Sequence, residues 1–187
     1  MECPIEIKGE ISSEQLSQMF NDKYLEIFDK EEMPAPMLEL NECRSYKTDG
    51  EHIHVKAVVD SGASESVAPP EMCPAYPIKE SPGSRAGIGY RSAGKGRIAN
   101  EGEQILNVLM EDGTPANVKY QIAQIRRPLN SVSEICDGGN QVIFGRGGGL
   151  IYNIQSGRQT FFRREGGIYT MEFWVKPPSN APFQGQG

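Results

Sequence analysis

One short segment combines a carboxylate, a hydroxyl and a glycine at the end of an apolar run. Residues 55–59 are Val-Lys-Ala-Val-Val, a stretch typical of a buried strand, and Asp60, Ser61, Gly62 and Ala63 follow directly. A carboxylate there is costly to bury unless it has a partner. The small residues allow a tight turn that brings backbone N–H groups to the carboxylate. An acid held in this way suits acid–base chemistry on a bound water.

The same segment also has a purely structural interpretation. Asp-Ser-Gly is a common turn, because Asp and Ser side chains hydrogen-bond to nearby backbone and Gly adopts positive φ. The apolar strand before Asp60 and the Ala-Ser pair after Gly62 favour a functional loop over a simple turn. The segment alone leaves both interpretations open.

A predicted hairpin positions the Asp60 loop. Residues 47–50, Lys-Thr-Asp-Gly, carry the Asp-Gly signal of a hairpin turn, and residues 51–59 form the returning strand. His52 and His54 alternate with apolar residues on this strand, so we expect them on its exposed face and give them little catalytic weight. The hairpin would hold the loop on a rigid element.

A second, glycine-rich hairpin is predicted over residues 86–103. Its flanks are strand-like, its tip falls within residues 92–96, and residues 97–99 begin the return strand. The glycine spacing is not that of a phosphate-binding loop, and no Gly-Lys-Ser/Thr occurs there. Such a tip is usually a simple turn; the functional alternative is a mobile cover over a cleft.

Residues 1–36 are predicted as an N-terminal extension. Ser12 and Gln15 form a capping box, and apolar residues recur at helical spacing, so a helix should run over residues 13–30 and end before Pro34 and Pro36. Its polar face is acidic, which favours packing on the domain or a partner over membrane binding. Residues 176–187 are rich in Pro, Gly, Ser, Asn and Gln and are predicted to be a disordered tail.

Residues 37–175 are predicted to form one mainly β domain. Short strands with turn signals between them are expected at 37–46, 102–110, 116–125, 141–144, 150–153, 160–163 and 168–175. Residues 66–80 hold four prolines and are predicted to be irregular, and residues 82–85 to be a turn. A short helix should follow Ser131, with Glu134 completing a capping box and two glycines ending it.

The composition of the chain argues against several classes of function. The 187 residues carry a net charge of −6, with five Lys or Arg against thirteen Asp or Glu in residues 1–51, which argues against a nucleic-acid binder. The four cysteines are far apart and only two histidines occur, so we expect no metal site and no cofactor. Without a secretory signal or an apolar run near 20 residues, we expect an intracellular, cytoplasmic protein that is not secreted and does not bind membranes.

The order of these features resembles a known family. An apolar strand, Asp60-Ser61-Gly62-Ala63, a glycine-containing hairpin, a strand and a short helix follow one another as in a retropepsin, the aspartic protease of retroviruses and LTR retrotransposons. The run Leu-Asn-Ser-Val-Ser at residues 129–133, with the helix and strand after it, looks like the protease of copia-like retrotransposon polyproteins. The resemblance covers about residues 37–175. It implies a closed β-barrel or sandwich with a flap hairpin.

The resemblance also implies a site. Asp60 matches the catalytic aspartate, Ser61 the hydroxyl residue that bonds across the family's dimer interface, and Gly62 and Ala63 the loop backbone that holds carboxylate and substrate. The glycine-rich hairpin matches the flap, and the residues assigned to substrate covering are Tyr90, Ser92, Gly94 and Gly96. This chemistry needs two acids that share one proton about a water.

The chain supplies only one such acid. Asp-Ser-Gly occurs once and Asp-Thr-Gly does not occur, while the other Asp-Gly pairs, at Asp49, Asp112 and Asp137, fall in predicted turns. We therefore expect a two-fold symmetric homodimer in which the two copies of Asp60 meet at the axis. An extended peptide, such as a polyprotein segment, would bind as an added strand under the two flaps.

Other functions stay open. The family has a Gly and an Arg before its late helix, whereas this chain has Leu129-Asn130-Ser131 at that place. One alternative is therefore an inactive retropepsin-like module that serves only for dimerisation. A nucleic-acid-binding segment is a second alternative, and it would use Arg146, Arg158, Arg163 and Arg164 with Phe161 and Phe162. The acidic N-terminal helix is alternatively a pro-segment or an element that binds a neighbour.

Overall fold

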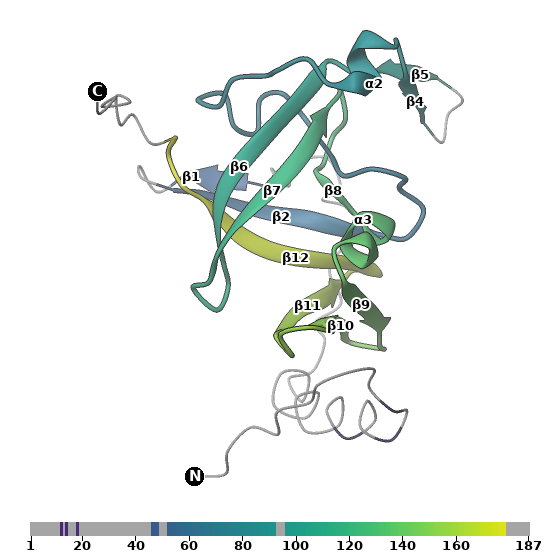
Figure 1. The fold of residues 1–187 in the computed structure, drawn as a ribbon, viewed down its shortest axis with the longest axis vertical. Coiled ribbons are helices and arrows are strands. Elements are labelled where there is room, and N and C mark those ends of the chain that lie inside the picture. Colours follow the sequence, from purple (N-terminus) through teal and green to yellow (C-terminus); the bar gives the residue numbers. More distant parts are fainter. Residues whose placement is uncertain are drawn as a thin grey trace. The chain divides into compact units, whose positions relative to one another are not determined.

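The structure is mainly β, as the sequence predicts. The computed structural model describes residues 12, 14, 18, 46–48, 52–92 and 96–178, and Figure 1 shows their course. In order, the elements are β1 (Tyr46–Thr48), β2 (Ile53–Asp60), β3 (Val67–Ala68), α2 (Pro82–Arg85), β4 (Gly89–Arg91), β5 (Arg97–Ala99), β6 (Gly102–Met110), β7 (Pro115–Ile122), β8 (Leu129–Ser131), α3 (Val132–Asp137), β9 (Asn140–Phe144), β10 (Gly148–Asn153), β11 (Gln159–Glu165) and β12 (Ile168–Val175).

The described residues fall into two compact units. The first, called the loop unit because it contains the Asp60 loop, includes Val58–Ser64 and Ser131–Met171. The second, called the hairpin unit, comprises the described parts of Arg44–Ala57, Glu65–Asn130 and Glu172–Gly187. Both β2 and β12 contribute residues to each unit.

The hairpin unit is built on the long β6–β7 hairpin, which Figure 1 shows as two adjacent strands. The register runs from Gly102 opposite Ile122 to Leu109 opposite Pro115. β3 pairs in parallel with β7 and antiparallel with β8, the end of β12 pairs with β6, and β1 pairs with β2. β4 and β5 pair only with each other, as a separate two-stranded sheet.

Alternating burial along these strands forms the core of the hairpin unit. Leu106 and Val108 on β6 are buried, whereas Ile105, directly before Leu106, is 54% exposed. The rings of Tyr120 and Phe173, both buried, stack with centroids 6.4 Å apart. Because each buried aromatic or branched side chain contributes about 1.5–3 kcal/mol, this strand face supplies much of the stability of the unit.

The side-chain amide of Gln104 on β6 holds the proline-rich segment at residues 66–80 in place through two hydrogen bonds. Gln104, 2% exposed, donates from Nε2 to the carbonyl oxygens of Cys73 at 3.1 Å and Tyr76 at 2.8 Å. Burial raises the pKa of the Cys73 thiol to about 12, which makes it unreactive. The segment is irregular as predicted except for β3, which two residues of sequence could not reveal.

One helix was not predicted. Residues 82–85, expected to be a turn, form the single helical turn α2. Ser81 Oγ accepts a hydrogen bond from Ser84 N at 3.1 Å, and Ser84 Oγ accepts one from Ser81 N at 2.9 Å. With Pro82 in the first helical position, these reciprocal bonds satisfy the end of the helix. The Ser-Pro signal was present in the sequence.

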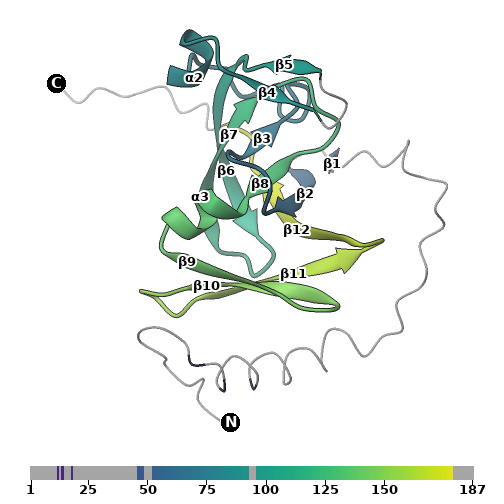
Figure 2. The same ribbon diagram turned by 90° about the vertical axis from the view of Figure 1, so that its right-hand side faces the viewer.

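The loop unit holds an antiparallel meander, and Figure 2 shows its strands β9, β10 and β11 side by side. β11 pairs onward with the first residues of β12. Gly149 on β10 lies opposite Phe162 on β11, and a Cβ at this position would come within 2.0 Å of Phe162 Cζ. Only glycine therefore fits there. Leu150 and Tyr152, both 0% exposed, form the core on which Phe161 packs.

Most predicted strand boundaries agree with the structure. β6 and β12 span the predicted residues 102–110 and 168–175. β7 differs from the predicted residues 116–125, because it ends at Ile122. Lys47 and Thr48, predicted to begin a turn at residues 47–50, belong to β1, and the other two residues of that turn lie outside the described residues.

Several predictions lie outside the described residues. These are the helix at residues 13–30, of which only Glu14 and Gln18 are described and are helical, and the strand up to residue 45. Residues 179–187 of the predicted tail also lie outside. Lys176, its first residue, is hydrogen-bonded from its N–H to the Asn107 carbonyl oxygen at 2.8 Å. In the described ranges no helix has the length and apolar character needed to cross a membrane.

Candidate functional site

The Asp60 loop begins where β2 ends. Ser61 and Gly62 turn the chain immediately, and Gly62 N donates to Asp60 Oδ1 at 2.7 Å. The carboxylate is thus held by its own loop, as the sequence predicts. A Cβ at Gly62 would lie 3.3 Å from the same oxygen, so a larger residue there would press on the carboxylate. Asp60 is partly exposed.

A buried serine fixes the far end of this loop. Ser131 is 0% exposed, and its Oγ donates to the Ala63 carbonyl oxygen at 2.8 Å. The same Oγ accepts from Glu134 N at 3.3 Å, which makes Ser131 the N-cap of α3, and it lies 2.8 Å from Ser133 Oγ. The sequence predicted the cap but not the bond to Ala63, because the two residues are 68 positions apart.

The glycine-rich hairpin exists, with β4 and β5 as its arms. The antiparallel register places Gly89 opposite Ala99, Tyr90 opposite Ile98 and Arg91 opposite Arg97. At the tip, Ser92 N donates to the Gly96 carbonyl oxygen at 3.0 Å, and Gly96 N donates to Ser92 Oγ at 3.2 Å. Gly94 lies outside the described residues. The predicted return strand at residues 97–99 is confirmed.

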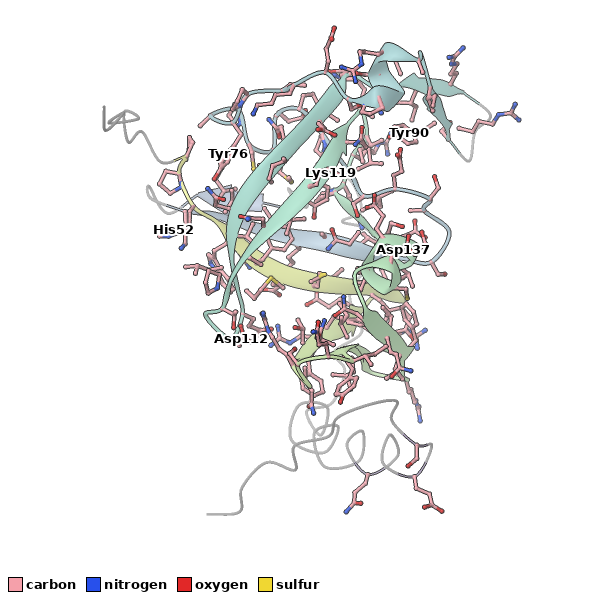
Figure 3. All side chains as sticks on the ribbon, in the orientation of Figure 1. His52, Tyr76, Tyr90, Asp112, Lys119 and Asp137 are labelled. Atoms are coloured by element: carbon pink, nitrogen blue, oxygen red, sulfur yellow. The ribbon has the colours of Figure 1, made fainter. Side chains whose placement is uncertain are left out.

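Tyr90, labelled in Figure 3, ties this hairpin to the rest of its unit. Its hydroxyl donates to Glu65 Oε2 at 2.7 Å and accepts from Asn100 Nδ2 at 3.2 Å. Asn100 Nδ2 also donates to Gln121 Oε1 at 2.9 Å, and Asn100 Oδ1 accepts from Gly102 N at 2.9 Å. Buried polar groups of this kind are costly unless they are paired. The sequence analysis missed Glu65, Asn100 and Gln121.

The structure brings the predicted site residues together in two sets. The Asp60 loop and Ser131 belong to the loop unit, and the hairpin with Tyr90 and Ser92 belongs to the hairpin unit. Glu65, the partner of Tyr90, follows Asp60 by five positions in the sequence. A short covalent link therefore connects the candidate acid to the anchor of the hairpin.

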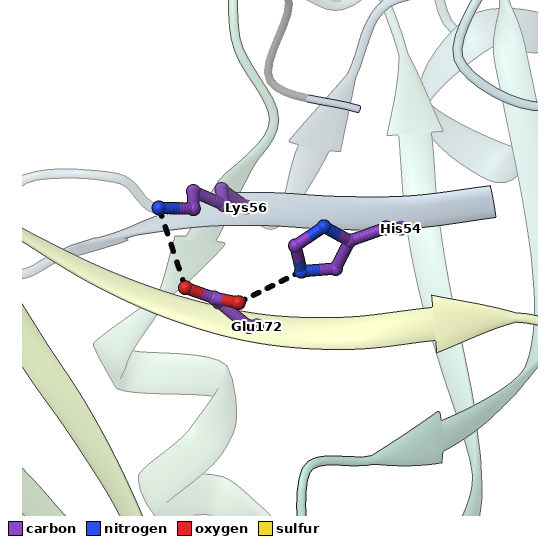
Figure 4. Close-up of polar contacts among 3 residues, drawn as sticks. All are labelled: His54, Lys56 and Glu172. Carbon is purple, nitrogen blue, oxygen red and sulfur yellow. Dashed lines mark hydrogen bonds and ion pairs between the residues drawn. The ribbon is translucent and has the colours of Figure 1, made fainter. Parts of the chain in front are cut away.

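A second polar cluster lies on β2 and β12 of the hairpin unit (Figure 4). His54 Nε2 donates to Glu172 Oε2 at 2.7 Å, and Lys56 Nζ lies 3.3 Å from Glu172 Oε1. The His54 ring stacks on Trp174 with centroids 4.8 Å apart, so His54 is only 27% exposed and does not lie on an open face as predicted. Burial raises the pKa of Glu172, but the bond from His54 and the charge of Lys56 outweigh it, so the net shift is downward.

Several residues of the alternative nucleic-acid-binding site make contacts within the fold. Phe162 is 1% exposed and presents no ring face for base stacking, and Phe161 is partly buried against the core of the loop unit. The Arg164 guanidinium lies over the Tyr169 ring, 5.7 Å from its centroid, and Nη1 donates to the Arg146 carbonyl oxygen at 3.1 Å. These contacts are those of a folded strand face.

No metal-binding group of three or more His, Cys, Asp or Glu occurs within the described ranges. Cys73 and Cys136 are free thiols. No protein-family model, curated protein or solved structure matches this chain. The functional assignment therefore depends on the residues themselves.

Proposed function

We propose that the chain is an aspartic endopeptidase of the retropepsin type that acts as a homodimer and processes a polyprotein. One observation carries the proposal: the Asp60 carboxylate lies at a strand end, bonded at 2.7 Å to Gly62 N, in a loop that Ser131 fixes at its other end. A catalytic acid needs this kind of preorganised support, because small displacements of a reacting group are costly to rate.

Two such carboxylates would perform the chemistry. In the proposed dimer, Asp60 of each chain faces a shared water, and close like charges keep one of the two acids protonated. The ionised acid accepts a proton from the water as the water oxygen attacks the scissile carbonyl carbon, and the protonated acid donates its proton to the carbonyl oxygen. As the tetrahedral intermediate collapses, the acid that received the water proton donates it to the amide nitrogen, the C–N bond breaks, and the other acid takes its proton back. The pair would titrate as one unit, with two apparent pKa values that belong to neither residue alone.

In this proposal the β4–β5 hairpin is the flap of the family's closed barrel. The antiparallel pairing of Tyr90 with Ile98 and the two bonds between Ser92 and Gly96 support a hairpin that moves as one piece. Such a cover sequesters the reaction from water and completes the binding cleft around an extended peptide.

The decisive experiment compares the wild-type chain with Asp60→Asn, incubated with an unstructured protein between pH 4 and 7. The substitution keeps an acceptor for the Gly62 N–H while removing the ionisable group, so cleavage should disappear while circular dichroism and the sedimentation coefficient stay unchanged. A statine-type inhibitor should block the wild-type activity.

The alternatives predict different results from the same samples. Cleavage that persists at the wild-type rate in Asp60→Asn would place the activity elsewhere. A dimer without cleavage in either protein would indicate the inactive dimerisation module instead.

A further inference from the structure

We propose that the β4–β5 hairpin carries a binding site for an acidic side chain of an extended peptide, formed by Arg91 and Arg97. The site would give the proposed protease a preference for substrates with Glu or Asp near the cleaved bond, and in that sense it rests on the proposed function.

The first observation is that two positive charges, those of Arg91 and Arg97, face each other across the hairpin. Arg91 and Arg97 lie directly opposite each other in the antiparallel register. Side chains so paired project from the same face with Cβ atoms about 4.5–5.5 Å apart, and like charges there are destabilising. Both arginines are exposed, and neither forms an ion pair with any described residue. An anion placed between them would relieve this repulsion.

The second observation is that one arginine is already positioned. The Arg97 guanidinium donates from Nη2 to the Gly87 carbonyl oxygen. Its side chain lies over Gly89, since a Cβ at that glycine would come within 3.1 Å of Arg97 Nε and 3.4 Å of its Cγ. The absence of a side chain at position 89 therefore makes the space in which Arg97 lies. A guanidinium fixed in this way keeps other N–H groups for a ligand at a lower entropic cost.

The third observation is a pocket at the same place. An open pocket of about 560 Å³ is lined, among the described residues, by Gly89, Tyr90, Arg91 and Arg97. Tyr90, between Gly89 and Arg91, is held in place by the hydrogen bond of its hydroxyl to Glu65. The planar fork of arginine matches a carboxylate through paired N–H···O bonds. The chemistry of the lining thus selects a small anion carried on an extended chain.

A peptide carboxylate fits better than a nucleic-acid phosphate. The whole chain has a net charge of −6, so a long polyanion would be repelled beyond the pocket. A single carboxylate on an extended peptide meets only the local arginine pair. Its backbone would also add hydrogen bonds along a strand edge.

The test is a binding measurement that does not depend on cleavage. Two fluorescein-labelled decapeptides of Thr are compared, one with a single central Glu (the Thr-Glu peptide) and one with a single central Gln (the Thr-Gln peptide). Each is titrated with the full chain carrying Asp60→Asn, and anisotropy is recorded. The Thr-Glu peptide should bind about five- to tenfold more tightly than the Thr-Gln peptide. In Arg91→Gln/Arg97→Gln that ratio should fall to about one. A labelled ten-residue oligo-dT is titrated in parallel.

The matched control removes the same charge from elsewhere in the hairpin unit. Arg85→Gln/Arg126→Gln alters two exposed arginines outside the pocket and should keep the preference for the Thr-Glu peptide. Equal loss in both double variants would overturn the proposal in favour of general charge attraction. Equal affinity of the two peptides for the Asp60→Asn chain that keeps both Arg91 and Arg97 would also overturn the proposal. Binding of oligo-dT alone, lost in Arg91→Gln/Arg97→Gln, would overturn it in favour of a nucleic-acid site.

The outcome is separable from that of the proposed function. If cleavage is never detected but the Thr-Glu preference and its loss are found, the acidic-peptide site stands while the protease proposal fails. If cleavage depends on Asp60 but both peptides bind equally, the protease stands and this site fails.

Discussion

Ser131 Oγ donates a 2.8 Å hydrogen bond to the Ala63 carbonyl oxygen, so the first turn of α3 fixes the loop that begins at Asp60. The same oxygen caps the helix by accepting from Glu134 N at 3.3 Å. One hydroxyl therefore links the formation of α3 to the geometry of the loop. Ser131 itself is 0% exposed.

Replacing Ser131 with alanine should weaken both elements. Ser131→Ala leaves the partly buried Ala63 carbonyl without its donor and the helix without its cap, so we expect unfolding free energy to fall by about 2 kcal/mol in urea denaturation. Peptide cleavage should fall with it, because the loop loses its support. The control is Ser133→Ala, an exposed serine whose hydroxyl contacts Ser131, which should cost under about 0.5 kcal/mol. Equal effects of the two substitutions would contradict this role.

Tyr90→Phe should loosen the β4–β5 hairpin without changing its shape. The substitution keeps the ring but removes the hydroxyl that bonds to Glu65 and Asn100, a net loss of about 1 kcal/mol. Hydrogen exchange of the β4 and β5 amides should become roughly fivefold faster. Tyr169→Phe makes the same chemical change in the loop unit, where the hydroxyl donates to the Gly145 carbonyl oxygen, and should leave this exchange unaltered. Unchanged protection in Tyr90→Phe would show that the hydroxyl does not anchor the hairpin.

The lowered pKa of Glu172 predicts a pH-dependent contribution to stability. His54 and Lys56 favour the ionised carboxylate in the folded chain, so the contribution is present above the unfolded pKa of about 4.3 and is lost as pH falls through the lower folded value. Glu172→Gln should therefore lower unfolding free energy at pH 5.5 by up to about 1 kcal/mol, since the group is partly exposed, and by much less at pH 3.

Urea denaturation of the two proteins at these pH values gives the comparison. Lys56→Met removes the positive charge beside Glu172 but keeps the hydrogen bond from His54. It should therefore lower the unfolding free energy at pH 5.5 by less than Glu172→Gln does. Stability curves of wild type and Glu172→Gln that run parallel from pH 3 to 5.5 would exclude the ion pair as a contributor.

Dilution should test whether two chains form one site. If each chain carries half of the acid pair, specific cleavage activity should fall once the protein is diluted below the dimer dissociation constant. Sedimentation over the same concentrations should show monomer appearing as activity is lost. Specific activity that stays constant over a thousandfold dilution would argue for a complete site in one chain.

The sequence by itself determined the features that depend on neighbouring residues. The bounds of β6 and β12 follow from alternation and turn signals, the Asp60 turn follows from its small residues, and the cap of α3 follows from Ser131. In each, the interacting groups lie within a few positions of one another. The helix α2 was not predicted, because its Ser-Pro start was assigned to a turn.

Only the tertiary structure decided which distant side chains meet. Ser131 and Ala63 are 68 positions apart, His54 and Glu172 are 118 apart, and Tyr90 and Glu65 are 25 apart. No periodicity marks such partners, because a hydroxyl, an imidazole or a phenol satisfies its hydrogen bond with whatever group the fold brings within reach. The Asp60 loop was therefore recognisable in the sequence, whereas the serine that fixes it became visible only once α3 was folded against it.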